Sequence, residues 1–493
     1  MTEPVSRRAA VPAVLGVLSV AVLGFGVALI EGRLQVGPLP VDAITTLVPL
    51  AIVALVPLAR RSGTSGLEKL GLLAPLLAFL ALQLVSVAMN GFGSDMLATS
   101  ARYTGYGALM LIVALVARER ATRRWLMWIV LAVGVAVSLI GIGSYVQMAL
   151  AYLTRTGAGL GSLPSFRITS TFQNANFLGE YLVIVIGAGL ALAFAERRGR
   201  RVLALAGTLV CGLALVLTYT RGSWLALAIA LSVALLAVEA RYFWGLVVVG
   251  VAGGLVVPGF LPRLASSFST QGTAGFRMRL WRIAGEAIAE HPLAGWGPGR
   301  FYDAFSATVA AHPELGVGYS MYGAHNSYFT LLAETGLIGG LAFLALVASV
   351  VRSGVRAVAR ATEHAVRLEA AALTAGLGGF ALNALTSNSF QHPQPAVFFW
   401  LVAGLLGGLA LEVDALALAG AAAEAKAPGR WVAGSRVVQA LAPVRSSMRC
   451  AWQASGFARV LLSEPRTRAA LLDGSLLVRL VFGRPGRTEE AER

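Results

Sequence analysis

The sequence predicts an all-α, polytopic integral membrane protein with about 12 transmembrane helices and one long helical loop outside the membrane. Three observations lead to this prediction. The 493 residues are 57% hydrophobic and only 13% charged, and their mean hydropathy of +0.74 is too high for a water-soluble globule. Long apolar runs recur along most of the chain. The arginines between these runs gather in short clusters at alternate junctions, a pattern typical of membrane proteins.

Each predicted span needs about 20 apolar residues to cross roughly 30 Å of hydrocarbon. The first apolar run is long enough to span and lacks a clear small-residue cleavage site, so it is interpreted as a membrane helix and not as a signal peptide. We expect spans near residues 11–30, 38–58, 67–89, 98–117, 125–150, 177–195, 202–219, 223–238, 242–259, 326–351, 368–387 and 395–413.

The arginine clusters predict the orientation of the chain. Alternate loops, near residues 7–8, 60–61, 118–124, 197–201, 241 and 352–367, hold the clusters and belong in the cytoplasm together with both termini. The loop near 260–325 is then external, although it carries Arg263, Arg277, Arg279, Arg282 and Arg300. Because positive charge on the translocated side opposes the topological bias, this loop is expected to have a function.

The chain divides into a transmembrane domain at 1–415 and a basic cytoplasmic tail at 416–493. A net charge of +16 could suggest nucleic acid as a partner, but the basic residues lie in short clusters between apolar runs, so we expect none. Two cysteines, Cys211 and Cys450, provide no disulfide framework, and no His/Cys/Asp cluster has metal-ligand spacing. Neither a structural disulfide nor a metal site is predicted.

Arginines in two places are candidates for an anion site. Arg221 lies in a very tight turn between two apolar runs, where a charge is costly and so is often functional, although it could also reach lipid headgroups or pair with an acid. Arg277, Arg279 and Arg282 open a predicted amphipathic helix at 276–290, and the last two could equally form a solvated face with an Arg282–Glu286 pair. Planar guanidinium groups suit phosphate better than a point charge does.

His325 is the candidate proton acceptor. It stands where the polar loop ends and the apolar run begins, and its ordinary pKa near 6.5 suits a general base, although a histidine at a helix start is often only a cap or interfacial residue. Asn326 beside it could orient the ring or a sugar hydroxyl. Glu334 would lie roughly 13 Å along the same helix, where a structural role is favoured. The glycines beyond it are expected to let another helix approach closely: Gly336, Gly339 and Gly340.

Four ordered elements resemble the O-antigen ligase and polymerase superfamily of bacterial membrane glycosyltransferases. Residues 218–224, TYTRGSW, are similar to the family's TRGxW turn, and residues 276–297 to its R…W…P-G-G loop. His325-Asn326, nine residues and then a G-x-x-G at 336–339 fit its H-N/S-x9-G-x-x-G signature, while residues 172–177, FQNANF, resemble its N-x-N element. The resemblance covers about 165–345.

The resemblance implies a C-type glycosyltransferase that needs no cofactor, nucleotide sugar or metal. The donor would be a glycan on undecaprenyl diphosphate at the outer face of the bacterial inner membrane. Arg221 and Arg277 would hold the diphosphate, and His325 would activate the acceptor hydroxyl for an inverting displacement. The further residues expected to bind substrate are Asn176, Arg279, Arg300 and Asn326, with structural support from Glu334, Gly336 and Gly339.

The sequence does not identify the molecule that accepts the glycan. A ligase would move the glycan to lipid A–core or another surface acceptor, whereas a Wzy-type polymerase would join it to a second lipid-linked glycan. The signature around His325 favours the ligase. A twelve-helix transporter or flippase is a weaker alternative, because the long loop follows the ninth predicted span and no similarity between two halves is apparent.

Overall fold

The computed structural model of the chain describes residues 33–36, 39–62, 66–159, 162–256, 273–318 and 320–426, together with Val20. These residues are helical or in connecting loops apart from one antiparallel hairpin, in which β1 (Arg33–Val36) pairs with β2 (Leu39–Asp42). The predicted helical fold class is confirmed. The predicted span at 11–30, except Val20, and the tail after 426 lie outside the described residues, as do Arg263 and Cys450.

Each of the other predicted spans corresponds to a helix. Seven of these helices, α5–α8 and α13–α15, are long and apolar enough to cross a membrane, so the chain is an integral membrane protein; the total of twelve spans stays a prediction. The span expected at 38–58 begins later, because β2 occupies its first residues. The bounds are α2 (Ala43–Ser62), α3 (Leu73–Met89), α4 (Ser94–Val116), α5 (Arg120–Thr156), α6 (Ala175–Ala195), α7 (Arg198–Leu217), α8 (Arg221–Val238), α9 (Ala240–Val256), α13 (Ser327–Arg360), α14 (His364–Asn383) and α15 (Pro393–Lys426).

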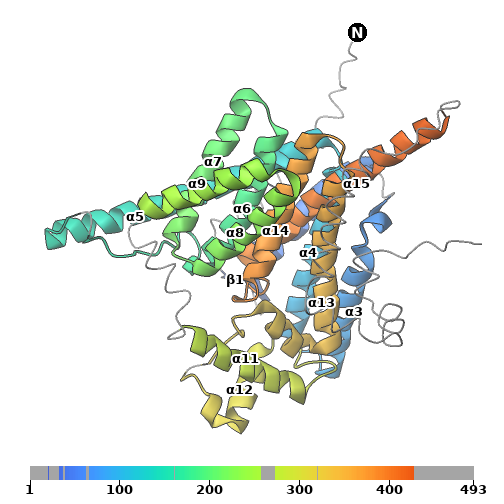
Figure 1. Cartoon of the computed structure of the whole chain (residues 1–493). Coiled ribbons are helices and arrows are strands. Elements are labelled where there is room, and N and C mark those ends of the chain that lie inside the picture. Colours follow the sequence, from blue (N-terminus) through green and yellow to red (C-terminus); the bar gives the residue numbers. More distant parts are fainter. Residues whose placement is uncertain are drawn as a thin grey trace, which may run out of the picture. The chain divides into compact units, whose positions relative to one another are not determined.

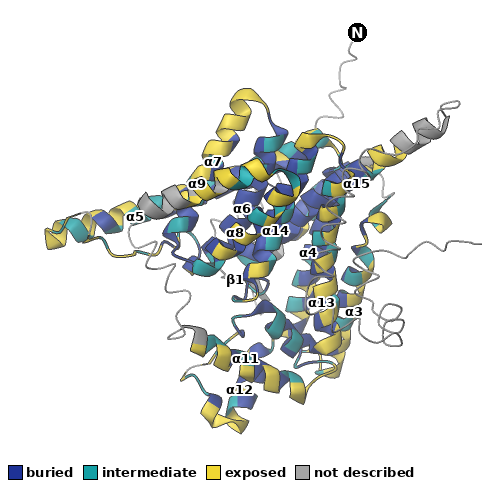
Figure 2. Ribbon diagram, viewed as in Figure 1, coloured by how far each residue is buried: buried dark blue, intermediate teal, exposed yellow. Residues whose placement is uncertain are grey.

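Helices α6 and α14 form the centre of the bundle, and α14 also packs against α8. The α6 and α14 backbones touch at two glycines: a Cβ atom on Gly187 would lie 2.5 Å from the Cα atom of Gly376. Helix α15 is buried along most of its apolar length, whereas α7 exposes large apolar side chains such as Val202 and Leu209 (Figure 2). The outward apolar face of α7 suits contact with lipid chains.

The loop predicted outside the membrane folds into a small helical layer of its own, α11 (Thr273–Glu290), α12 (Phe301–Ala311) and the short helix η4 (Pro313–Leu315) (Figure 1). The predicted amphipathic helix at 276–290 is confirmed, because Leu280 and Ala284 are buried on one face of α11. They belong to a second apolar core, which also includes Phe305 of α12 and Ala333 of α13. This core fixes the layer against the start of α13.

Helix α13 is broken at Gly336, which has a left-handed φ of 70°, so the unbroken helix expected after His325 is wrong. The turn at 292–297 fills the break: Leu337 N donates to Pro292 O at 2.8 Å, and Gly297 N donates to Glu334 O at 2.9 Å. A Cβ atom on Gly336 would lie 2.2 Å from Leu293 O. The close neighbour of Gly336 is therefore a loop and not another helix. The apolar pattern continues across Gly336, so the sequence gives no sign of the break that the distant turn stabilises.

Candidate active site

The predicted donor-binding and base residues all lie at the same end of the central helices. Arg221 is the first residue of α8, Arg277 lies near the start of α11, and His325 directly precedes the cap of α13. The pKa of Arg277 is lowered, first by burial and then by the positive charge of Arg221. The pKa of His325 is lowered by burial and by Arg277. The charge of Arg221 thus acts on Arg277, and the charge of Arg277 acts on His325, which links the three residues electrostatically.

The tight turn at 218–220 places Arg221, and the N-x-N element supports that turn. The Asn174 side chain caps α6 by accepting a hydrogen bond from Asn176 N at 2.8 Å. Thr220 Oγ1 donates to Ala175 O at 3.1 Å. Arg167 joins the two pieces, because its Nη2 donates to Asn176 Oδ1 at 2.7 Å and its Nε donates to Thr218 O at 2.9 Å. Asn176 Oδ1 thus has a partner within the protein, and that partner, Arg167, was not among the site residues predicted from the sequence.

The backbone conformation of His325 presents its ring at the start of α13. The residue has a left-handed φ of 50°, which is uncommon for a side chain other than glycine. Its ring meets that of Phe276 edge-on, with 6.0 Å between the centroids. Asn326 follows and caps α13, since its Oδ1 accepts from Tyr328 N at 3.0 Å and Phe329 N at 3.1 Å. That oxygen therefore supports the helix that carries His325.

A polar loop at 384–392, between α14 and α15, lies against the starts of α13 and α6. Ser327 N donates to Ala384 O at 2.8 Å and to Ser387 O at 2.9 Å, while Phe390 N donates to Ser327 Oγ at 3.1 Å. Ser387 Oγ also donates to the buried carboxyl group of Glu180 on α6. None of the site residues predicted from the sequence lies in this segment. Its run of asparagine, serine, glutamine and histidine between two apolar helices was the available signal.

His392 at the end of this loop is a second histidine of the site. Its ring lies on that of Phe177, with 3.4 Å between the centroids, next to Asn176. Burial lowers the pKa of His392 to about 3, and its electrostatic interaction with His325 adds to this effect. The imidazole is therefore neutral at physiological pH and can exchange hydrogen bonds without carrying charge.

Two predicted binding residues have other surroundings. Arg300 contacts carboxylates, with Nη1 2.9 Å from Asp303 Oδ2 and Nη2 3.5 Å from Asp95 Oδ2 at the start of α4. Arg279 is exposed on α11. Glu334 connects α13 to the outer layer, because its carboxyl group accepts from the backbone N–H groups of Gly299 and Phe301. A Cβ atom on Gly339 would lie 2.6 Å from Thr335 Oγ1 of α13 itself and 3.9 Å from Leu82 Cβ of α3, an ordinary contact distance, so the predicted close helix approach at this glycine stays a prediction.

The arrangement combines an anion site with a proton acceptor. Arginine side chains provide paired donors that match phosphate oxygens. Since the pKa of His325 lies below its usual 6.5, the ring is largely neutral near pH 7 and can accept a proton from a hydroxyl group. The site is thus equipped to hold a phosphorylated substrate and to activate a hydroxyl nucleophile beside it.

Comparison with known families gives one match. Residues 204–344 match the family model described as O-antigen ligase, a range that runs from α7 into α13 and includes Arg221, Arg277 and His325. Asn176 and His392 lie outside the matched range. No curated protein matches the chain. Over residues 204–344, the chain is thus similar to the O-antigen ligase family.

Proposed function

We propose that the protein is an O-antigen ligase-like glycosyltransferase that moves a glycan from undecaprenyl diphosphate to a hydroxyl acceptor. The observation that carries the proposal is the grouping of two arginines and a neutral histidine, Arg221, Arg277 and His325, at one end of the bundle and inside the matched region. The description of the matched family as O-antigen ligase favours a ligase over a polymerase, and we propose lipid A–core as its acceptor. The family resemblance suggests a reaction at the outer face of the bacterial inner membrane.

The proposed reaction is a single displacement that needs no metal. Arg221 and Arg277 hold the diphosphate oxygens of the donor, while His325 takes the proton of the acceptor hydroxyl. The hydroxyl oxygen bonds to the anomeric carbon as the bond from that carbon to the diphosphate oxygen breaks, and the configuration inverts. The bonding electrons leave on undecaprenyl diphosphate, where the two guanidinium groups stabilise the added negative charge.

The arginine clusters support an orientation with this site outside. Clusters occur where α5, α7 and α14 begin, at 118–124, 197–201 and 352–367, and these are the opposite ends of the helices from the candidate site. Cytoplasmic loops are the ones enriched in arginine. We therefore assign the end of the bundle that carries the arginine clusters, together with both termini, to the cytoplasm. The layer of α11 and α12 is assigned to the outside.

A reconstitution tests the proposal. The purified full chain would receive lipid-linked oligosaccharide with and without lipid A–core, and every lipid-borne product would be sized. We expect the glycan on lipid A–core. A ladder that grows on undecaprenyl diphosphate alone would identify a Wzy-type polymerase, which uses the same three residues with a second lipid-linked glycan as acceptor. No transfer to any hydroxyl acceptor would contradict the enzyme assignment and favour a transporter.

A further inference from the structure

The end of the bundle opposite the candidate active site contains a cavity of about 120 Å³ between α5, α14 and the α6–α7 turn. This volume is much larger than the roughly 10–15 Å³ that one water molecule requires. Four arginines line the cavity, two from the start of α5 and two from the start of α7: Arg120, Arg124, Arg197 and Arg201. Neither the family match nor the proposed reaction gives these side chains a role.

Three helices begin around this cavity. Helix α5 starts at Arg120, α7 at Arg198 and α14 at His364. At none of the three does the N-cap side chain make a capping hydrogen bond. The first N–H groups of a helix lack partners within the helix, and they form its positive end. The cavity is therefore surrounded by three positive helix ends in addition to its arginine side chains.

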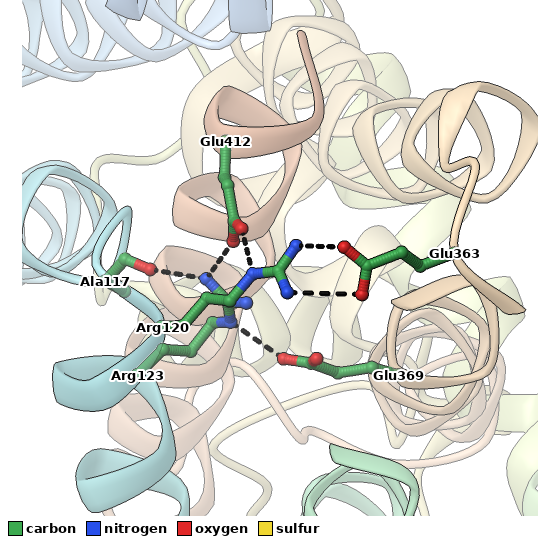
Figure 3. Close-up of polar contacts among 6 residues, drawn as sticks. All are labelled: Ala117, Arg120, Arg123, Glu363, Glu369 and Glu412. Carbon is green, nitrogen blue, oxygen red and sulfur yellow. Dashed lines mark hydrogen bonds and ion pairs between the residues drawn. The ribbon is translucent and has the colours of Figure 1, made fainter. Parts of the chain in front are cut away.

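The carboxylates around the cavity already have arginine partners. Arg120 contacts Glu363 at 2.8 Å and also pairs with Glu412, and Arg123 contacts Glu369 at 2.7 Å (Figure 3). Glu196, which also lines the cavity, pairs with Arg200 at 3.2 Å and accepts a hydrogen bond from Trp128.

Three lining arginines remain outside this network. Arg124, Arg197 and Arg201 make no ion pair within the described residues, although the charges of Arg124 and Arg197 help Arg120 to lower the pKa of Glu363. Arg201 Nε donates to the backbone carbonyls of Ala193 and Glu196, and this holds its guanidinium group at the α6–α7 turn. The cavity consequently has positive charge that its own acids do not balance.

Apolar surface adjoins the charged residues. Trp125 of α5 and Val202 and Leu203 of α7 are 57%, 65% and 62% exposed. Arg200 lies over the rings of Trp125 and Trp128, at 6.0 and 5.8 Å from their centroids. Tryptophan is frequent at the boundary between lipid headgroups and chains. A polar cavity beside such a surface suits an amphiphile whose charged group enters while its chains follow α7.

We propose that this cavity binds a phosphate group, held by Arg124, Arg197 and Arg201 and by the nearby helix starts. Topological bias accounts for many arginines at this end of the bundle, but it does not require them to surround a cavity. The phosphate can belong to the headgroup of an anionic lipid or to a free phosphate ion. The exposed apolar surface beside the cavity favours the lipid.

Native mass spectrometry of the delipidated, purified full chain tests this proposal. Dioleoyl phosphatidylglycerol, dioleoyl phosphatidylcholine and inorganic phosphate would be titrated separately. We expect one phosphatidylglycerol to bind more tightly than phosphatidylcholine, and Arg124→Ala with Arg197→Ala to weaken it about tenfold or more, since hydrogen bonds to charged groups are the strong ones. Binding of inorganic phosphate with the same sensitivity would support the site with free phosphate as ligand.

Two further variants make the result specific. Arg60→Ala with Arg352→Ala removes the same charge from exposed positions that do not line the cavity, so it is expected to leave the affinity unchanged. Ala365→Trp fills the cavity without changing any charge and is expected to weaken binding as well. The proposal is wrong if phosphatidylglycerol binds no better than phosphatidylcholine and phosphate does not bind, or if both cavity variants bind like the wild type.

Discussion

Arginines cluster at both ends of the central helices, but their positive charge is balanced differently at the two ends. Where α5 and α14 begin, Arg123 is buried and contacts Glu369 at 2.7 Å and Glu412 at 2.9 Å. At the opposite end, burial and the charge of Arg221 lower the pKa of Arg277. Arg277 forms no ion pair within the described residues. The ends are about 30 Å apart, the length of a 20-residue helix.

The difference separates two uses of one residue type. An arginine that forms an ion pair with a carboxylate of another helix holds the two helices together, and the carboxylate balances its charge. An arginine held near a second arginine is electrostatically unfavourable until an anion joins them. We therefore expect substitution of the paired Arg123 to act on stability and substitution of Arg277 to act on transfer.

The largest effect is expected at the candidate active site. His325→Asn keeps a side chain that tolerates the left-handed backbone but removes the base, and Arg277→Ala removes a donor to the diphosphate. Each is expected to lower glycan transfer about a hundredfold or more in the reconstituted assay, with little change in the amount of folded protein. The matched controls are His312→Ala and Arg282→Ala on the exposed side of the outer layer. Normal transfer by His325→Asn would remove that residue from the mechanism.

The opposite end is expected to respond in stability. Arg123→Ala leaves Glu369 buried without its partner, which typically costs about 3–5 kcal/mol. Arg360→Ala breaks a more exposed pair with Asp414, where the cost is about 0–1 kcal/mol. Thermal unfolding in detergent measures both, and transfer per folded molecule should stay near the wild-type value. Equal melting temperatures for the two variants would contradict the structural role of Arg123.

Features predicted correctly from the sequence are those set by neighbouring residues. The apolar runs specify helices, the spacing of Leu280 and Ala284 specifies the buried face of α11, and the sharp junction at His325 specifies the start of α13. The expectation that Arg221, Arg277 and His325 act together came from the family resemblance, because hydrophobic periodicity does not reveal which helix ends lie close together in space.

Features missed depend on contacts between distant segments. The break at Gly336 exists because residues 292–297 insert there, although the apolar pattern continues across it. His392 joins the site because its loop is held by Ser327 and by Glu180 of α6. The arginines at 118–124 indicated orientation, but nothing local indicated that Arg123 would meet Glu369.

A smaller loss of stability is expected at the helix break. Gly336→Ala places a Cβ atom 2.2 Å from Leu293 O at a φ of 70°, and such strain costs about 1–3 kcal/mol. Gly378→Ala on α14 is the control, because its Cβ atom would meet nothing within 4 Å. Thermal unfolding should show a lower melting temperature for Gly336→Ala alone. An unchanged melting temperature would mean that the 292–297 turn does not hold the break.

The smallest effect concerns the titration of His325. Burial and Arg277 lower its pKa below 6.5, so the neutral ring persists as pH falls through 6.5 and is lost only at more acidic pH. Diethyl pyrocarbonate reacts with neutral imidazole, so peptide mass spectrometry of its reaction rate against pH reports this pKa without requiring activity. Arg277→Gln removes the second cause and is expected to move the midpoint upward, though still below 6.5 because burial remains. Arg282→Gln should leave it in place, and a midpoint unmoved by Arg277→Gln would show that Arg277 does not act on the base.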